Sequence, residues 1–311
     1  MTITTLSRYQ GALVGLAVGD AVGTTLEFKR PGSFEPITDM VGGGPFNLEP
    51  GQWTDDTSMA LCLAKSLIEC EGFDAHDQMN RYIRWYKEGY LSSNGQCFDI
   101  GNTVFDALDL FLETGDPLSG SASPDTAGNG SLMRLAPVPL YYAEDPIQAI
   151  TFCAKSSQAT HGAKACVDAC RYYGGLIIGA LQDKTKEEIL ADSFSPIAEL
   201  WQSDSLCEEI SEIAKGSFKD KSPPDIQGSG YVVKSLEAAL WAFYQSNDFK
   251  QGCLMAANLG DDADTTAAIY GQIAGAFYGI DGIPISWRER IVFSTVIHNM
   301  ASDLYETRES L

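Results

Sequence analysis

The chain has 311 residues, 44% of them hydrophobic, which is enough to bury a sizeable core, and we interpret residues 1–311 as a single domain. The formal net charge of −21 argues against DNA or RNA as a polymer partner, because nucleic-acid backbones require a basic protein face. A small anionic ligand stays compatible with this charge, since metal ions or helix N-termini can neutralise it locally.

The first predicted helix runs from about Ser7 to Val18 and carries glycines four residues apart, which places them on one stripe. A helix near the C-terminus repeats this stripe. Glycine inside a helix costs about 1 kcal/mol relative to alanine, so such a stripe indicates close approach of another backbone. We expect the stripes to pack on each other and to bring the segment from Asp20 to Glu27 near Asp262, although each could instead meet another helix. The stripes are Gly11, Gly15 and Gly19, and Gly271, Gly275 and Gly279.

Residues 28–52 are rich in glycine and proline and show little helical periodicity. Long irregular connections in a compact domain are usually lids, binding loops or disordered segments. Because this segment joins Glu27 to the acidic run that follows, we expect it to wrap a functional site.

That acidic run, Trp53-Thr54-Asp55-Asp56-Thr57-Ser58, precedes a predicted helix over residues 59–70, which Gly72 would close as a C-terminal cap. Asp and Thr at the start of a helix are first of all N-caps. Taken alone, the run therefore predicts only where a helix begins.

Further helices are predicted near residues 75–90 and 101–113, and Asp99-Ile100-Gly101-Asn102-Thr103 at the start of the second is typical of an N-cap. Residues 119–139 are rich in Ser, Gly and Pro. Within them, the glycines of Gly128-Asn129-Gly130-Ser131 would let the backbone approach a ligand and turn its amides toward phosphate. A plain Asn-Gly turn is the alternative.

His161 lies between two predicted helices, the second over residues 163–181, and a lone histidine is usually only a satisfied polar group. The charged segment 182–227 is predicted to be surface decoration on the same domain. Tyr231 opens an apolar helix over residues 232–244 and could be an ordinary core residue.

The last long helix is preceded by Gly260-Asp261-Asp262-Ala263-Asp264-Thr265-Thr266. On a helix Asp262 and Asp264 would point about 200° apart, so they converge only from a loop or a helix start. Clustered carboxylates repel unless a cation joins them, and Mg²⁺ or Mn²⁺ is the natural neutraliser. Two acidic, threonine-flanked helix starts in one domain are what a two-ion site needs.

Segments with helical periodicity dominate and strand-like runs are few, so we predict an all-α orthogonal helical bundle. Eight scattered cysteines without a Cys-x-x-Cys pair, and no signal peptide at Met1, indicate reduced thiols and a cytoplasmic protein. The three histidines do not cluster with cysteine, which argues against zinc. No stretch reaches the roughly 18 uninterrupted apolar residues that a membrane span requires.

These motifs, in this order, resemble the ADP-ribosylglycohydrolase family, which includes the dinitrogenase reductase activating glycohydrolase. The resemblance covers nearly the whole chain. The motifs that carry it are Thr54-Asp55-Asp56-Thr57, Asp262-Ala263-Asp264-Thr265, Gly19-Asp20-Ala21-Val22-Gly23 followed by Glu27, Asp99-Ile100-Gly101-Asn102-Thr103, Gly128-Asn129-Gly130-Ser131-Leu132-Met133-Arg134, Thr160-His161 and Gly230-Tyr231-Val232.

The resemblance implies a compact all-α fold, often monomeric, with a dinuclear Mg²⁺ or Mn²⁺ site at helix N-termini. It also implies ADP-ribose as the bound group and an ADP-ribosylated protein as the substrate. The implied metal ligands are Thr54, Asp55, Asp56, Asp262, Asp264 and Thr265, the implied catalytic residues are Asp99, Glu27 and Asp56, and the implied substrate-binding residues are Gly101, Asn129, Gly130, Ser131, His161 and Tyr231.

The implied activity is metal-dependent removal of ADP-ribose, with the N-glycosidic bond to arginine as the first hypothesis. The ions would bind the distal ribose diol and a bridging water, while the carboxylates stabilise an oxocarbenium-like state. Either Asp99 or Glu27 would act on the water or on the leaving group. Hydrolysis of serine-linked or small-molecule conjugates and a non-catalytic ADP-ribose-binding or structural relative are the alternatives. Asp261 stands where many relatives have glycine, and we expect it to cap the helix or to lie behind the ligands.

Overall fold

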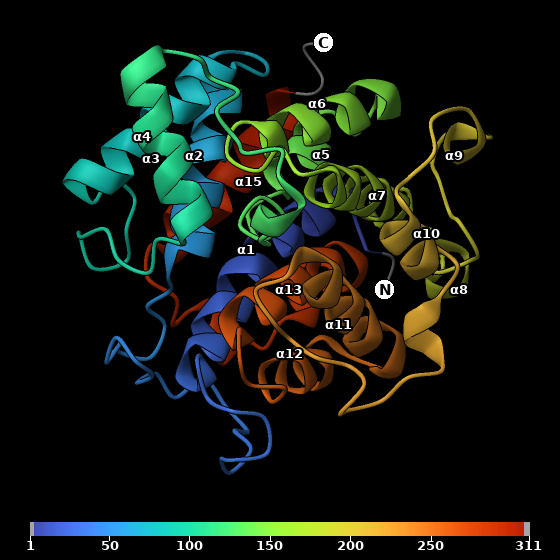
Figure 1. Cartoon of the computed structure of the whole chain (residues 1–311). Helices are drawn as coiled ribbons and strands as arrows, with labels where there is room; N and C mark the ends of the chain where they lie inside the picture. The colour runs from blue at the N-terminus through green and yellow to red at the C-terminus, as the bar shows by residue number, and fades with distance from the viewer. Residues whose placement is uncertain (1–2, 308–311) are drawn as a thin grey trace.

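The computed structural model describes residues 3–307, and it confirms the all-α prediction (Figure 1). Pairing between extended segments in this range is limited to isolated bridges. The α-helices are α1 (Thr5–Gly23), α2 (Asp55–Glu69), α3 (Ala75–Glu88), α4 (Asn102–Thr114), α5 (Pro137–Tyr141), α6 (Pro146–Gln158), α7 (Lys164–Leu181), α8 (Lys186–Ile189), α9 (Leu200–Ser203), α10 (Glu208–Ala214), α11 (Val232–Gln245), α12 (Phe249–Ala257), α13 (Ala263–Tyr278), α14 (Ile285–Arg288) and α15 (Ser294–Thr307). The 3-10 helices are η1 (Thr24–Leu26), η2 (Pro124–Thr126), η3 (Ser217–Lys219) and η4 (Ile280–Gly282).

The antiparallel pair α1 and α13 lies side by side in the middle of the molecule (Figure 1). A Cβ atom on Gly11 would lie 2.1 Å from the carbonyl oxygen of Gly275, and one on Gly19 would lie 2.1 Å from that of Ala267. Because no real Cβ atom tolerates such distances, the two backbones can touch only where the stripes are glycine. The predicted packing of the stripes is confirmed, and it places the end of α1 beside the start of α13.

Helix α2 begins with the first acidic run and ends with a two-residue cap. The left-handed residue is Glu71, with φ of 52°, and the amide of Gly72 donates to the carbonyl of Leu67 at 3.0 Å. In this kind of cap the residue after the left-handed one closes the helix. Gly72 therefore closes α2 as predicted, while the left-handed conformation falls one residue earlier.

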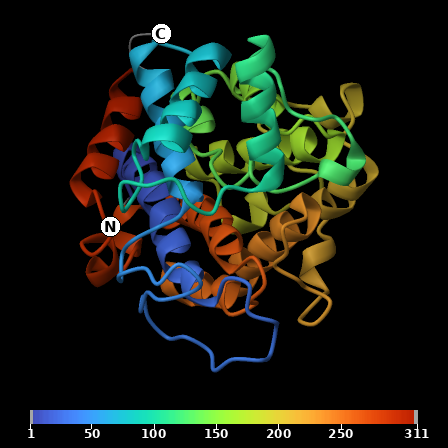
Figure 2. The same cartoon turned by 60° about the vertical axis from the view of Figure 1, so that its left-hand side comes forward.

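Residues 28–52 form the predicted irregular loop, blue at the bottom of Figure 2. Within it, Gly43 and Leu48 exchange two backbone hydrogen bonds of 2.7 and 2.9 Å. At its start, the amide of Phe28 donates to the carbonyl of Asp261 at 2.7 Å, and the amide of Asp261 donates back to the loop at 2.7 Å. The loop is thus pinned to the second acidic run.

The segment 182–227 carries α8, α9, α10 and η3 and lies along one side of α7 and α11 (Figure 1). Ile210 and Phe218 from this segment are buried within the main apolar core. Between residues 3 and 307, the helices all lack the combination of length and apolar character needed to cross a membrane.

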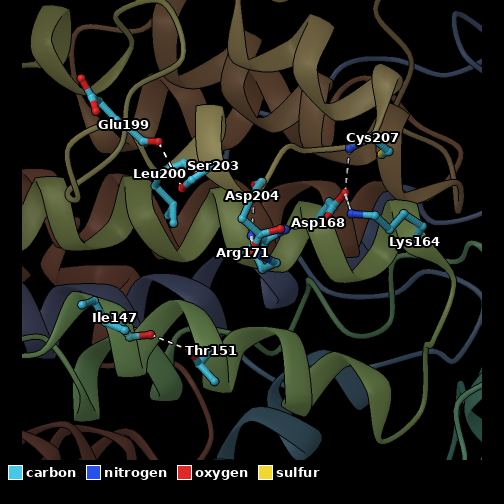
Figure 3. Close-up of polar contacts among 10 residues, drawn as sticks. All are labelled: Ile147, Thr151, Lys164, Asp168, Arg171, Glu199, Leu200, Ser203, Asp204 and Cys207. Atoms are coloured by element: carbon cyan, nitrogen blue, oxygen red, sulfur yellow. Dashed lines mark hydrogen bonds and ion pairs between the residues drawn. The ribbon is translucent and has the colours of Figure 1, made fainter.

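A buried group of ion pairs, which we call the Asp168 cluster, ties this segment to α7 (Figure 3). The Asp168 carboxylate accepts hydrogen bonds from Lys164 at 2.5 Å, from Arg171 at 2.9 Å and from the backbone amide of Cys207 at 2.7 Å. Arg171 also pairs with Asp204. Both carboxylate oxygens of Asp168 therefore have cationic donors.

Candidate active site

Asp20, near the end of α1, caps the start of α2. Its Oδ1 accepts hydrogen bonds from the amide and hydroxyl of Thr54 at 2.9 and 3.0 Å, and its Oδ2 accepts from those of Thr57 at 3.0 and 2.6 Å. Thr54 is the N-cap residue, yet its own side chain makes no capping bond, so a carboxylate from another helix fulfils that role. Burial raises the pKa of Asp20 to about 6, and these hydrogen bonds oppose the rise.

The two acidic helix starts are joined by their side chains. The Thr54 hydroxyl lies 3.4 Å from Oδ2 of Asp264, and the Thr265 hydroxyl donates to Oδ1 of Asp56 at 3.1 Å. Carboxylate oxygens of Asp20, Asp56 and Asp264 lie within 4.8 Å of one another. The packing of α1 on α13 thus gathers three buried carboxylates from three helices.

A second group of carboxylates shares Asp264 with the first. Oxygens of Glu27, Asp99 and Asp264 lie within 4.8 Å of one another. Asp99 is held in the left-handed region with φ of 63°, just before α4. Burial, with the neighbouring charge of Asp262, raises the pKa of Asp99 to about 7, and burial with the charges of Asp264 and Asp99 raises the pKa of Glu27 far above its usual range.

Glu27, Asp99 and Asp264 line a cavity of about 330 Å³ whose described lining contains no lysine or arginine. Asp20 and the predicted ligands Thr54 and Asp56 are not among its lining residues. Oδ2 of Asp56 and Oε2 of Glu27 are buried and accept no hydrogen bond from the part of the chain that the structure describes. Buried acceptors without donors are rare and costly, and hard divalent cations prefer such oxygens. Burial and neighbouring carboxylates raise the pKa of Asp56 and Asp264 well above the usual range. The residues present therefore fit divalent ions.

The remaining predicted carboxylate ligands lie at the cavity but outside these two groups. Asp55 and Asp262 both line the cavity. Asp262 is the N-cap residue of α13, and its Oδ2 accepts a hydrogen bond from the Asn129 side chain at 2.8 Å. Asn129 thereby connects the second acidic run to the glycine-rich loop.

Another wall of the cavity is formed by this glycine-rich loop, His161 and the start of α4. A Cβ atom on Gly130 would lie 2.9 Å from Cε1 of His161, so the loop can rest on the ring because the residue is glycine. Burial lowers the pKa of His161 to about 3, which keeps the ring neutral at neutral pH. Gly101, the N-cap residue of α4, provides no capping side chain for the first amides of that helix.

Two predicted substrate-binding residues are not among the residues that line the cavity. The Ser131 hydroxyl accepts a buried hydrogen bond from Ser157 at 2.9 Å on the far side of the loop. Tyr231 is the N-cap residue of α11 and is 39% exposed. Their side chains are placed by helix packing, which the local motif does not specify.

The structure also adds residues to the site. Asp20 joins the carboxylate cluster, and Phe28 lines the cavity. The glycine stripe on α1 is the signal that could have identified Asp20, because it predicts contact between the end of α1 and α13. Asp261 is exposed, has φ of 58° and lines a different cavity, whereas Asp262 and Asp264 line the cavity described above.

Comparison with known proteins connects this geometry to a family. Residues 1–310 match the ADP-ribosylglycohydrolase family. Proteins named ADP-ribosylarginine hydrolase Tri1 are similar to the chain: that of Pseudomonas putida (strain GB-1) is 45% identical over 97% of this chain and 78% of the relative, and that of Serratia proteamaculans (strain 568) is 42% identical over 96% and 79%. A solved structure described as an ADP-ribosylglycohydrolase-related protein complex matches with a TM-score of 0.86 and 39% identity, over 98% of this chain and 99% of the other. The chain belongs to the ADP-ribosylglycohydrolase family.

Proposed function

We propose that this protein hydrolyses the bond between ADP-ribose and an arginine side chain of a modified protein, with two Mg²⁺ or Mn²⁺ ions as cofactors. The observation that carries the proposal is the joined pair of acidic helix starts, where buried carboxylate oxygens lack donors and the cavity lining has no cationic side chain. The names of the two similar relatives, ADP-ribosylarginine hydrolase, support arginine as the linkage.

The ions would be held where the two helix starts meet. Bound there, they would supply Lewis acidity that orients a sugar diol and a water molecule. Asp20 completes the group of three buried carboxylates with Asp56 and Asp264, and it keeps α2 in place through Thr54 and Thr57. The residues that would hold the ions are Thr54, Asp55, Asp56, Asp262, Asp264 and Thr265.

The reaction forms a bond from the water oxygen to C1 of the distal ribose as the bond from C1 to the guanidine nitrogen breaks. The sugar passes through an oxocarbenium-like state, whose positive charge the buried carboxylates stabilise. We assign the proton transfers to Glu27 and Asp99. One of them takes a proton from the attacking water, and the other gives a proton to the leaving nitrogen.

The rest of ADP-ribose would lie along the wall formed by the glycine-rich loop, His161 and the start of α4. The uncapped start of α4 offers amides to the diphosphate, and helix N-termini favour anions. In the glycine-rich loop, the amides of Gly128 and Asn129 already donate to the carbonyls of Thr126 and Gly230 at 2.8 and 3.1 Å, so the loop would contribute its close backbone approach. Neutral His161 is held through Nδ1, 2.8 Å from the Thr160 hydroxyl, with Nε2 on the side of the glycine loop. It would support this wall without adding charge.

The test is release of ADP-ribose from a protein mono-ADP-ribosylated on arginine, with Mn²⁺, with Mg²⁺ and with chelator. Release that requires a divalent ion, and that disappears in the double variant Asp262→Ala, Asp264→Ala, is the expected result. A serine-linked substrate is assayed in parallel. Release from serine and not from arginine would overturn the proposed linkage, and binding of ADP-ribose with no release from either would favour a non-catalytic relative.

A further inference from the structure

Three phenylalanine rings form a continuous row that begins at the cavity with Phe28, and we call them the aromatic rim. The ring centroids of Phe28 and Phe46 are 6.4 Å apart with planes at 71°, and those of Phe46 and Phe98 are 5.2 Å apart with planes at 58°. Phe28 lines the cavity and is 66% exposed, while the other two are half-buried. The row thus runs from the cavity edge across a neighbouring loop.

Two rings of the rim are sequence neighbours of the second carboxylate group. Phe28 directly follows Glu27, and Phe98 directly precedes Asp99, whose carboxylates belong to that group. Phe46 comes from the irregular loop and touches both other rings. Phe46 therefore connects the two segments that carry Glu27 and Asp99, the carboxylates to which we assign the proton transfers.

The backbone conformation of Phe28 and the exposure of its ring are both unfavourable for the stability of the fold. Its φ of 59° lies in the left-handed region, which is unusual for a bulky side chain, and most of its ring contacts solvent. The backbone bond from its amide to the carbonyl of Asp261 holds it in place. Backbone strain of this kind concentrates at functional sites, where the surrounding structure maintains it.

We propose that the aromatic rim receives the guanidinium group of the modified arginine, and that Phe46 sets selectivity for a cationic leaving side chain. This inference rests on the proposed function and names how that function would distinguish its linkage. A planar guanidinium stacks on aromatic faces and is attracted by their negative potential.

Charge complementarity supports a cation as the occupant. Glu27 and Asp99 adjoin Phe28 and Phe98 in the chain, and the described residues lining the cavity include no lysine or arginine that would repel a cation. A serine hydroxyl carries no charge and has no flat face to stack. The rim would therefore favour arginine over serine without any change in the ribose or metal subsites.

The test measures the binding of two planar probes by ligand-observed NMR. The buffer contains Mg²⁺ and ADP-ribose but no Mn²⁺. The probes are n-butylguanidinium, which is charged, and n-butylurea, which has nearly the same shape and is neutral. We expect the wild type to prefer the guanidinium probe, and Phe46→Leu to weaken its binding by about three- to tenfold. Binding of the urea probe stays unchanged, and Phe46→Trp restores the preference.

The matched control is Phe152→Leu, which removes a half-buried ring on α6 that stacks on Tyr142 and does not line the cavity. It should leave both probes and ADP-ribose affinity unchanged. The proposal would be overturned if Phe46→Leu weakened the binding of both probes equally, or if the wild type bound both probes equally well. If the preference holds while the wild type releases no ADP-ribose from arginine, the proposed reaction fails and the rim stands as a cation-binding surface.

Discussion

Two buried carboxylate clusters in this molecule have opposite surroundings. Asp168 and Asp56 are both fully buried. Asp168 lies between Lys164 and Arg171, so its charge is balanced within the chain. Asp56 lies beside Asp20 and Asp264 and keeps an oxygen with no donor in the described structure. The first arrangement supplies its own counter-charge, whereas the second has the oxygen chemistry that fits a divalent cation.

The difference shows that burial alone does not distinguish a structural carboxylate from a functional one. What distinguishes them is whether the chain itself supplies the counter-charge. Removing a carboxylate should therefore have opposite consequences in the two clusters, and the following measurements test that expectation.

The largest effect is expected from Asp264→Asn, because Asp264 belongs to both carboxylate groups of the site. Loss of about 3 kcal/mol or more of transition-state stabilisation would lower the rate of ADP-ribose release by about 100-fold or more. Thermal unfolding without metal should show no loss of stability, since one repelling charge is removed. A variant that keeps its activity but unfolds at a lower temperature would place Asp264 with the structural carboxylates.

Asp168→Asn should show the reverse behaviour. Leaving Arg171 and Lys164 without their shared partner is expected to lower the free energy of unfolding by about 3 kcal/mol, as for other broken buried pairs. Urea unfolding measures this loss, and activity per folded molecule should stay near the wild-type value. Unchanged stability would mean that the Asp168 cluster does not anchor the segment beside α7.

Metal removal and pH separate the clusters further. A carboxyl whose pKa is raised in the folded state binds more protons when folded, so its contribution to stability is lost as pH rises. With chelator, stability should fall between about pH 4, the usual carboxyl value, and the pKa of about 6 for Asp20 and about 7 for Asp99.

Divalent ions favour the deprotonated carboxylates, so added Mn²⁺ should reduce or reverse this fall. Urea midpoints at pH 5 and pH 7, with chelator and with Mn²⁺, measure the effect. His161, whose lowered pKa gives the opposite slope, contributes equally to both conditions. The same slope with and without metal would contradict a cation site at these carboxylates.

The smallest effects concern single donors in each cluster. Thr57→Val removes the hydroxyl that donates to Asp20 at 2.6 Å and should cost about 1–2 kcal/mol of unfolding free energy. Lys164→Met removes a donor whose side chain is 62% exposed and should cost less than about 1 kcal/mol. Urea unfolding of both variants compares the two losses of unfolding free energy. A larger loss for Lys164→Met than for Thr57→Val would contradict the expectation that the more buried donor contributes more.

The fold and the central carboxylates were predictable because their signals are local. Helical periodicity located the main helices, and the acidic runs marked the starts of α2 and α13. The glycine stripes predicted the long-range contact between α1 and α13. Each of these signals is a repeat or a motif that can be read within about four helical turns.

Other features depend on contacts that no local pattern encodes. Asp20 accepts a hydrogen bond from Thr54, the N-cap residue 34 positions later, and nothing around Asp20 in the sequence identifies that partner. The Ser131 hydroxyl turns to Ser157 because of how α6 packs behind the loop. Phe46 lies in a segment without periodicity, so its position between two other rings emerges only from the folded chain.

The pairing of α1 with α13 also determines when the site can form during synthesis. The Thr54 hydroxyl and the Asp264 carboxylate are 210 positions apart, and the glycine stripe of α1 meets its partner only near the end of the chain. A nascent chain on the ribosome therefore holds α1 without its partner until α13 emerges. Such high contact order predicts slow, late assembly. A truncated translation product lacking α13 would lack Asp264 and Thr265, and with them the contacts that join the two acidic helix starts.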